Sequence, residues 1–177
     1  MKIFVASDIH GSKHYTKKFA KLIETENPDQ IILLGDLYYH GPRNKFPKGY
    51  NPKETANILN GYKNKIKCVK GNCDAEVDQM ISSFEIEDQY ETTINGKTFL
   101  FVHGHKLDAE NMPNKDFTFG GHTHIPVINA DLKNTTYVNP GSLGLPKSND
   151  GSTFAVIEEN KISIKSINRK VLYLVNF

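Results

Sequence analysis

Five apolar segments of this 177-residue chain each end in Asp, Asn or His, and a glycine stands beside the polar residue. We predict that these segments are strands, at residues 2–7, 30–34, 65–70, 97–102 and 116–120. Directly after them come Asp8-Ile9-His10, Gly35-Asp36, Gly71-Asn72, His103-Gly104-His105 and Gly121-His122-Thr123-His124. In open α/β sheets, ligands bind outside the carboxyl ends of the strands, so we expect these side chains to share one rim.

The order of the predicted elements indicates two different halves. Up to residue 70 the chain runs strand, helix, strand, helix, strand, with one helix over 12–26 and a second that begins at Asn51-Pro52, which favours a parallel α/β start. Short strands with tight turns dominate the rest, at 90–94, 97–102, 116–120, 125–129, 135–138, 153–157, 161–168 and 170–175. We therefore expect one α/β domain over residues 1–177, with two sheets and few helices.

Composition limits the partners and the cellular compartment that we expect for this chain. Lys and Arg number 22 against 20 Asp and Glu, so the formal net charge is only +2, which argues against bulk nucleic-acid binding. Two Cys are too few for a disulfide scaffold and favour a reducing compartment. With neither a signal-peptide pattern nor an apolar run long enough to cross a membrane, a cytoplasmic protein without membrane contact is expected.

The five strand ends together offer two Asp, one Asn and at least four His, donors that suit divalent transition metals. Seven donors are too many for one ion and fit two ions that share a carboxylate, an arrangement that hydrolyses phosphate esters. Each motif alone is weak, since loop carboxylates and hydrogen-bonded histidines are common. That alternative must explain why all of them lie at strand ends, so the residues favour a binuclear metallohydrolase.

The ordered motifs Asp-x-His, Gly-Asp, Gly-Asn, His-Gly and Gly-His-x-His resemble those of the calcineurin-like metallophosphoesterases. They span residues 8–124, and the turn Asn139-Pro140-Gly141-Ser142 extends the resemblance towards the end of the chain. The short length and the segments 40–44 and 71–80 resemble its subgroup of single-domain bacterial phosphodiesterases. The resemblance implies two packed mixed β-sheets flanked by helices, a four-layer α/β/β/α fold.

The resemblance also implies a ligand set and a cofactor. One divalent ion would be held by Asp8, His10, Asp36 and His124, and the other by Asp36, Asn72, His103 and His122. Asp36 would bridge the two ions, and a bridging hydroxide would be the nucleophile. The implied metal is Mn first, with Fe, Ni, Co or Zn as alternatives, and the implied assembly is a homodimer or homotetramer.

Cys73 departs from the pattern, because many phosphomonoesterases of the family carry His directly after the Asn. A thiol with a pKa near 8.5 is mostly neutral at pH 7 and cannot match an imidazolium beside a dianionic monoester. A diester carries one charge less, so we expect hydrolysis of small phosphodiesters. Further candidates to act on the substrate are Asn72 itself, Arg43 as a phosphate ligand and His105 as a support for the site.

Three alternatives remain open at this stage. The chain resembles phosphomonoesterases and small nucleases of the same family, although nuclease members are typically larger. A metal-binding scaffold of the same fold is the third, and loss of ligand histidines would point to it. Every ligand position here is filled by the expected residue type, which favours an enzyme.

Overall fold

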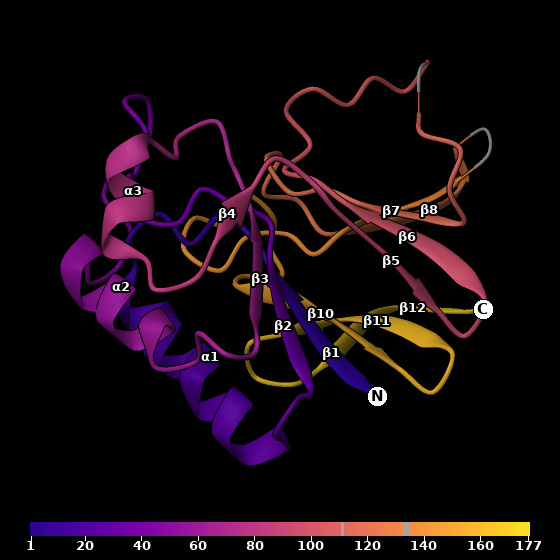
Figure 1. Cartoon of the computed structure of the whole chain (residues 1–177), viewed down its shortest axis with the longest axis horizontal. Coiled ribbons are helices and arrows are strands. Elements are labelled where there is room, and N and C mark those ends of the chain that lie inside the picture. The colour runs from indigo at the N-terminus through magenta and orange to yellow at the C-terminus, as the bar shows by residue number, and fades with distance from the viewer. Residues whose placement is uncertain (111, 133–134) are drawn as a thin grey trace.

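The computed structural model describes residues 1–110, 112–132 and 135–177, and two sheets dominate it (Figure 1). The 7-stranded sheet has the order β12-β11-β10-β1-β2-β3-β4, and the 5-stranded sheet has the order β5-β6-β7-β9-β8. The strands of the first sheet are β1 (Lys2–Ala6), β2 (Gln30–Leu33), β3 (Ile66–Val69), β4 (Ile86–Glu87), β10 (Thr153–Glu158), β11 (Lys161–Ser166) and β12 (Val171–Asn176). Those of the second are β5 (Tyr90–Ile94), β6 (Lys97–Phe101), β7 (Phe117–Phe119), β8 (Val127–Leu132) and β9 (Thr135–Asn139).

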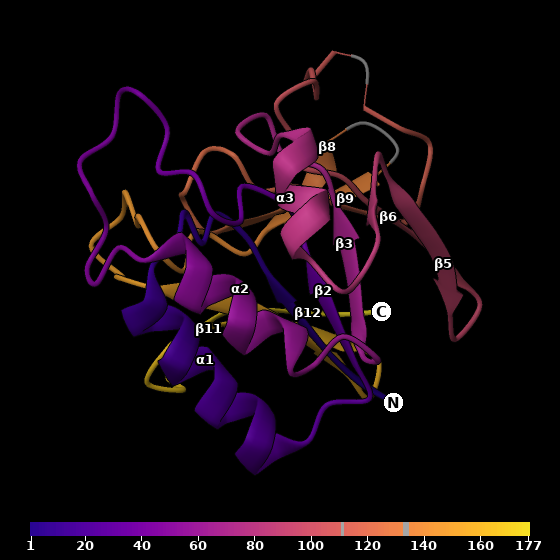
Figure 2. The ribbon, with the colours of Figure 1, turned by 60° about the vertical axis from the view of Figure 1, so that its left-hand side comes forward.

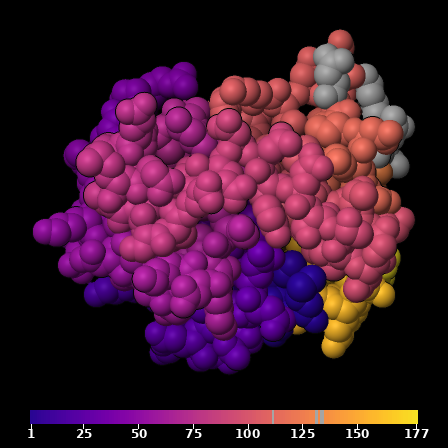
Figure 3. Space-filling model, viewed as in Figure 1, coloured from indigo at the N-terminus to yellow at the C-terminus, as the bar shows by residue number. Residues whose placement is uncertain are grey.

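Both sheets are mixed. In the first, β1, β2 and β3 run parallel, while β10 pairs with β1 in the antiparallel direction. In the second, β6, β7 and β9 run parallel, and β5 and β8 pair antiparallel at the two edges. Because the first and last parts of the chain pair in one sheet, the C-terminal strands lie beside the N-terminal strand, as the space-filling view also shows (Figure 3).

Three helices connect the early strands: α1 (Lys13–Glu26), α2 (Pro52–Asn60) and α3 (Glu76–Ile81). The first begins where the Ser12 side chain accepts a hydrogen bond from the Tyr15 amide, and the second where Asn51 caps the Glu54 amide. The helices lie on one side of the 7-stranded sheet (Figures 1 and 2). No helix within the described residues is long and apolar enough to cross a membrane.

Two apolar cores hold the layers together. The first lies between the helices and the 7-stranded sheet and is built around Phe4, Phe19 and Phe154. The second lies between the two sheets, where Val5 and Ile32 face Phe99 and the other phenylalanines of the 5-stranded sheet. Alternate residues of β1 therefore serve different cores, and this is why its sequence is apolar on both faces.

The predicted α/β class with two packed mixed sheets is confirmed. Helices cover only one outer face, since α3 is the last helix in the part of the chain that the structure describes. On the outer face of the 5-stranded sheet, Leu100 and Thr118 are also buried. The sequence indicated a helix after Asp74, and α3 is that helix, whereas the two-residue strand β4 carries no periodic apolar pattern and was not predicted.

Candidate metal centre

The polar residues after β1, β2, β3, β6 and β7 meet where the carboxyl edges of the two sheets come together. Several hydrogen bonds join the sheets here, among them those of His122 and His103. The amide of His122 donates to Asp8 Oδ2 at 2.9 Å, and His103 Nδ1 donates to the carbonyl oxygen of Leu34 at 2.6 Å. The loops of one sheet thus hold the side chains of the other.

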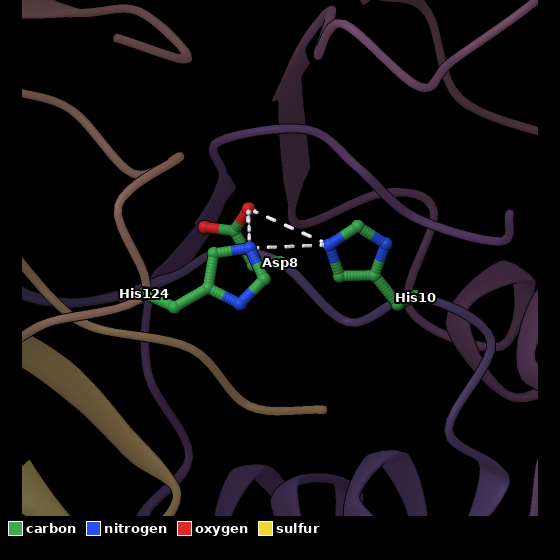
Figure 4. Close-up of side chains that lie close together, drawn as sticks. All are labelled: Asp8, His10 and His124. Atoms are coloured by element: carbon green, nitrogen blue, oxygen red, sulfur yellow. Dashed lines mark hydrogen bonds and ion pairs between the residues drawn. The ribbon is translucent and has the colours of Figure 1, made fainter. Parts of the chain in front are cut away.

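Asp8, His10 and His124 form the first cluster (Figure 4). Asp8 Oδ1 lies 3.7 Å from His10 Nε2 and 3.3 Å from His124 Nε2, and the two ring nitrogens are 3.4 Å apart. All three side chains are buried. Asp8 Oδ1 receives no hydrogen bond from the residues that the structure describes, which is costly for a buried carboxylate oxygen unless a cation serves it.

Asp36 extends this cluster into a second one. Its Oδ2 lies 3.6 Å from His10 Nε2 and 3.5 Å from His103 Nε2. His103 Nε2 in turn is 3.0 Å from Asn72 Oδ1. One carboxylate thus reaches histidines on both sides, and potential ligand atoms of Asp8, Asp36 and His103 fall within 4.8 Å of one another.

Hydrogen bonds to the main chain fix the tautomer of three histidines. Nδ1 of His10, His103 and His124 donates to a carbonyl oxygen, in each case at 2.6 Å; the acceptors are Tyr39, Leu34 and Leu145. A proton on Nδ1 leaves the neutral ring with a lone pair on Nε2, and it is Nε2 that faces the carboxylates. This is the arrangement by which proteins orient metal-binding histidines.

The electrostatics of the centre favour a bound cation. Burial alone would raise the pKa of Asp8, but the His10 and His124 rings beside it outweigh burial and hold that pKa well below its usual range. Burial lowers the pKa of His10, yet the contacts with Asp8 and Tyr39 raise it overall. Each shift shows that the carboxylates attract positive charge, which a divalent ion supplies more strongly than a proton.

The backbone of the centre is strained. Asp8, His10, Asp36, His122 and His124 all have a positive φ, between 50° and 66°, a region that side chains other than glycine rarely adopt. They make up half of the ten such non-glycine residues in the described chain. Strain of this kind persists where the surrounding structure imposes it, and it is concentrated at functional sites.

Asp74 ties together the loops that carry Asp36 and Asn72. Its carboxylate accepts hydrogen bonds from the amides of Asp36, Leu37 and Gly71 at 2.8, 2.8 and 2.7 Å. The sequence leaves open whether Asp74 orients a ligand or caps the next helix; the cap of α3 is Ala75, so Asp74 is not that cap. Glycine is required at position 71, because a Cβ there would collide with Asp36 Oδ1.

The turn at residues 139–142 supports the other side of the centre. Ser142 Oγ donates to the carbonyl oxygen of Asp8 at 2.7 Å and accepts from the amide of Leu145 at 2.8 Å. Since the carbonyl of Leu145 accepts from His124, the turn positions two residues of the first cluster.

The remaining predicted site residues lie around this centre at different distances. His122 is half-buried, with its ring centroid 5.3 Å from that of His103, and stands outside the groups of close ligand atoms. Cys73 has its sulfur near His10 and Asp36. The ring of the exposed His105 is tilted against that of His103 at a centroid distance of 5.4 Å. Nδ1 of His103 already donates to Leu34, and His105 lines a neighbouring hollow of about 410 Å³.

A pocket of about 770 Å³ opens over the centre, and Arg43, Asn72, Cys73 and His122 line it together with the ligand candidates. Two further lining residues, Tyr39 and Lys147, were not singled out from the sequence. The position of Tyr39, only three residues after Asp36, was the one sequence feature that could have pointed to it. No sequence feature pointed to Lys147, because it reaches the pocket through the path of the loop after Ser142.

Comparisons with known proteins agree with this geometry. The calcineurin-like phosphoesterase superfamily domain matches residues 1–161. Phosphodiesterase YfcE of Escherichia coli strain K12 is 37% identical over 173 residues, which cover 95% of this chain and 93% of the relative. The solved structure of a YfcE phosphoesterase from E. coli superposes with a TM-score of 0.95 at 32% identity, covering 99% of both chains.

A more distant structure, Vps29 of Entamoeba histolytica, shares the fold with a TM-score of 0.69 at 20% identity, over 100% of this chain and 99% of that one. The family and the enzyme class expected from the motifs are confirmed by the closer matches. The chain belongs to the calcineurin-like phosphoesterase superfamily.

Proposed function

We propose that residues 1–177 form one domain that hydrolyses small phosphodiesters with two divalent metal ions. The observation that carries this proposal is the position of Asp36, whose Oδ2 lies within 3.6 Å of His10 Nε2 and 3.5 Å of His103 Nε2. A carboxylate placed between two sets of donors is what a pair of ions requires. The names of the E. coli relatives support the diester as substrate.

The proposed ligands follow the two clusters. Asp8, His10, Asp36 and His124 would hold one ion, and Asp36, Asn72, His103 and His122 the other, with Mn the first metal to test ahead of Fe, Ni, Co and Zn. When bound, such ions would activate a water as the nucleophile and would neutralise charge on the phosphoryl oxygens.

The chain's own residues bind and orient the substrate. Arg43 and Lys147 place two cationic side chains on the pocket that contains the ligands, where they can contact phosphoryl oxygens. Asn72 lies in the same wall and can contact the substrate from beside His103. The thiol of Cys73 is neutral at physiological pH, because burial, followed by the charge of Asp36, raises its pKa to about 12.

Turnover of bis(p-nitrophenyl) phosphate should depend on added metal. We expect p-nitrophenolate release with Mn²⁺ and none after treatment with a chelator, with recovery when Mn²⁺ is restored. Circular dichroism on the same samples checks that the protein stays folded throughout. Absence of turnover with Mn²⁺ in folded protein would exclude the enzyme and favour a scaffold of the same fold.

Replacing Cys73 with His should shift the enzyme towards monoesters. An imidazolium beside the phosphate stabilises the second negative charge that a monoester carries, which the neutral thiol cannot do. We expect the ratio of kcat/KM for p-nitrophenyl phosphate to that for bis(p-nitrophenyl) phosphate to rise by about tenfold, the equivalent of one hydrogen bond to a charged group. Cys73→Ser is the matched control, and an unchanged ratio in Cys73→His would refute this account of the diester preference.

Association into a homodimer or homotetramer stays a prediction. Small phosphodiesters as partners, without bulk nucleic acid, agree with a net charge of only +2. Size-exclusion chromatography with light scattering gives the mass in solution, and the 20.0 kDa of one chain is the unit against which it is compared.

A further inference from the structure

Four rings in the loop after β2 contact one another beside the metal centre. The ring of His40 lies 4.8 Å from that of Tyr39, 4.6 Å from that of Phe46 and 5.3 Å from that of Tyr50. Phe46 and Tyr50 stack at 4.8 Å. We call these residues, Tyr39, His40, Phe46 and Tyr50, the aromatic wall.

Two rings of the aromatic wall are exposed, and the other two are half-buried. Tyr39 is 43% exposed and Phe46 is 68% exposed. Large rings on a soluble protein are normally turned inwards, and a group of exposed ones beside a polar pocket marks a place where a ligand binds. The mechanism proposed above makes no use of these rings.

Hydrogen bonds hold the aromatic wall in a fixed position relative to the ligands. The carbonyl oxygen of Tyr39 accepts from His10 Nδ1 at 2.6 Å, so a ligand candidate and the wall share one contact. The side-chain amide of Asn44 donates to the carbonyl of His40 at 2.9 Å, and Ser12 Oγ donates to that of Lys48 at 2.7 Å. The rings therefore form a surface that is organised before a substrate arrives.

Tyr39 connects the aromatic wall to the substrate pocket. It lines the same pocket as His10 and Asp36, and the cations Arg43 and Lys147 line that pocket too. A phosphate group bound at the centre would thus have an exposed ring and positive charge within one pocket. A ring and cations together suit an anionic ester whose organic group is planar and aromatic.

We propose that this enzyme acts on phosphodiesters with a planar aromatic ester group, which stacks on Tyr39 while the phosphate lies at the metal centre. Nucleosides and simple aryl groups are the two sources of such a group. The inference rests on the proposed function, since it assigns a substrate class to the same site. Tyr39 is then a specificity-determining residue. Its ring packs against His40, which in turn packs against Phe46.

Binding of product-like monoesters tests this proposal without relying on turnover. Calorimetry on the Mn²⁺-loaded protein would compare methyl phosphate, phenyl phosphate and thymidine 5′-monophosphate. We expect an aromatic ester to bind about tenfold more tightly than methyl phosphate, as base stacking on a protein ring allows. A gain for both aromatic esters indicates any planar ring, and a gain for only one of them identifies its source.

Variants at position 39 separate stacking from other effects. Tyr39→Ala and Tyr39→Leu should abolish the preference for the aromatic esters over methyl phosphate, whereas Tyr39→Phe should keep that preference. Tyr173→Ala is the matched control, because Tyr173 is 38% exposed on β12, outside the residues that line the pocket. Equal affinity of the wild-type protein for all three esters would overturn the inference. Failure of the proposed function would instead appear as absence of diester turnover.

Discussion

Asp36→Asn should lower the turnover of bis(p-nitrophenyl) phosphate by more than about 100-fold. This exceeds the loss expected when a residue that hydrogen-bonds a metal ligand is replaced. The amide is nearly the same size as the carboxylate, and its oxygen can still accept the hydrogen bond that the Cys73 amide donates to Asp36 Oδ1 at 2.8 Å. What changes is the charge, and with it the ability of one group to serve two ions. The same variant should therefore also lose bound metal.

Metal content measured by mass spectrometry gives the second readout. The wild-type protein is expected to hold two ions per chain after loading with Mn²⁺ and desalting, and Asp36→Asn one or none. Asp150→Asn is a suitable control, because Asp150 is exposed and its carboxylate accepts a hydrogen bond from Ser148. If Asp36→Asn kept two ions and full turnover, Asp36 would not bridge them.

That the candidate site residues lie together could be predicted, because it follows from the direction of the strands. Asp8, Asp36 and Asn72 come after three parallel strands of one sheet, so their positions at one edge need no knowledge of loops. His103 and His122 follow two parallel strands of the other sheet in the same way. The pattern of apolar runs ending in polar residues therefore contains most of the site.

Details set by loops and by distant pairing could not be predicted. The positive φ values of Asp8 and His124 arise from the packing of whole loops and leave no mark in the sequence. The hydrogen bond from His103 to the carbonyl of Leu34 could not be predicted, because backbone acceptors are invisible in a residue pattern. Tyr39 was passed over for the related reason that its exposure is a property of the fold.

The loops of the site also depend on a buried carboxylate, and its removal should be the most destabilising change outside the ligands. Asp74→Ala deprives the amides of Asp36, Leu37 and Gly71 of their acceptor. A buried donor without a partner costs about 1–3 kcal/mol, so we expect the free energy of unfolding to fall by roughly 3 kcal/mol or more. Urea denaturation of the metal-free protein measures this loss separately from metal binding.

Asp78→Ala provides a graded comparison. Asp78 is buried nearby and accepts a single backbone hydrogen bond from Ala75 at 2.8 Å, so its loss should be smaller. The stability loss of Asp74→Asn should lie between those of Asp74→Ala and Asp78→Ala. One side-chain oxygen remains as an acceptor, while the new NH₂ group faces a backbone amide. Burial raises the pKa of Asp74, although the backbone donors oppose it, so the carboxylate is kept for its hydrogen bonds in spite of burial. Equal urea midpoints for Asp74→Ala and Asp78→Ala would mean that the three hydrogen bonds to Asp74 do not hold the loops. The Asp36 and Asn72 loops would then be ordered by bound metal ions instead.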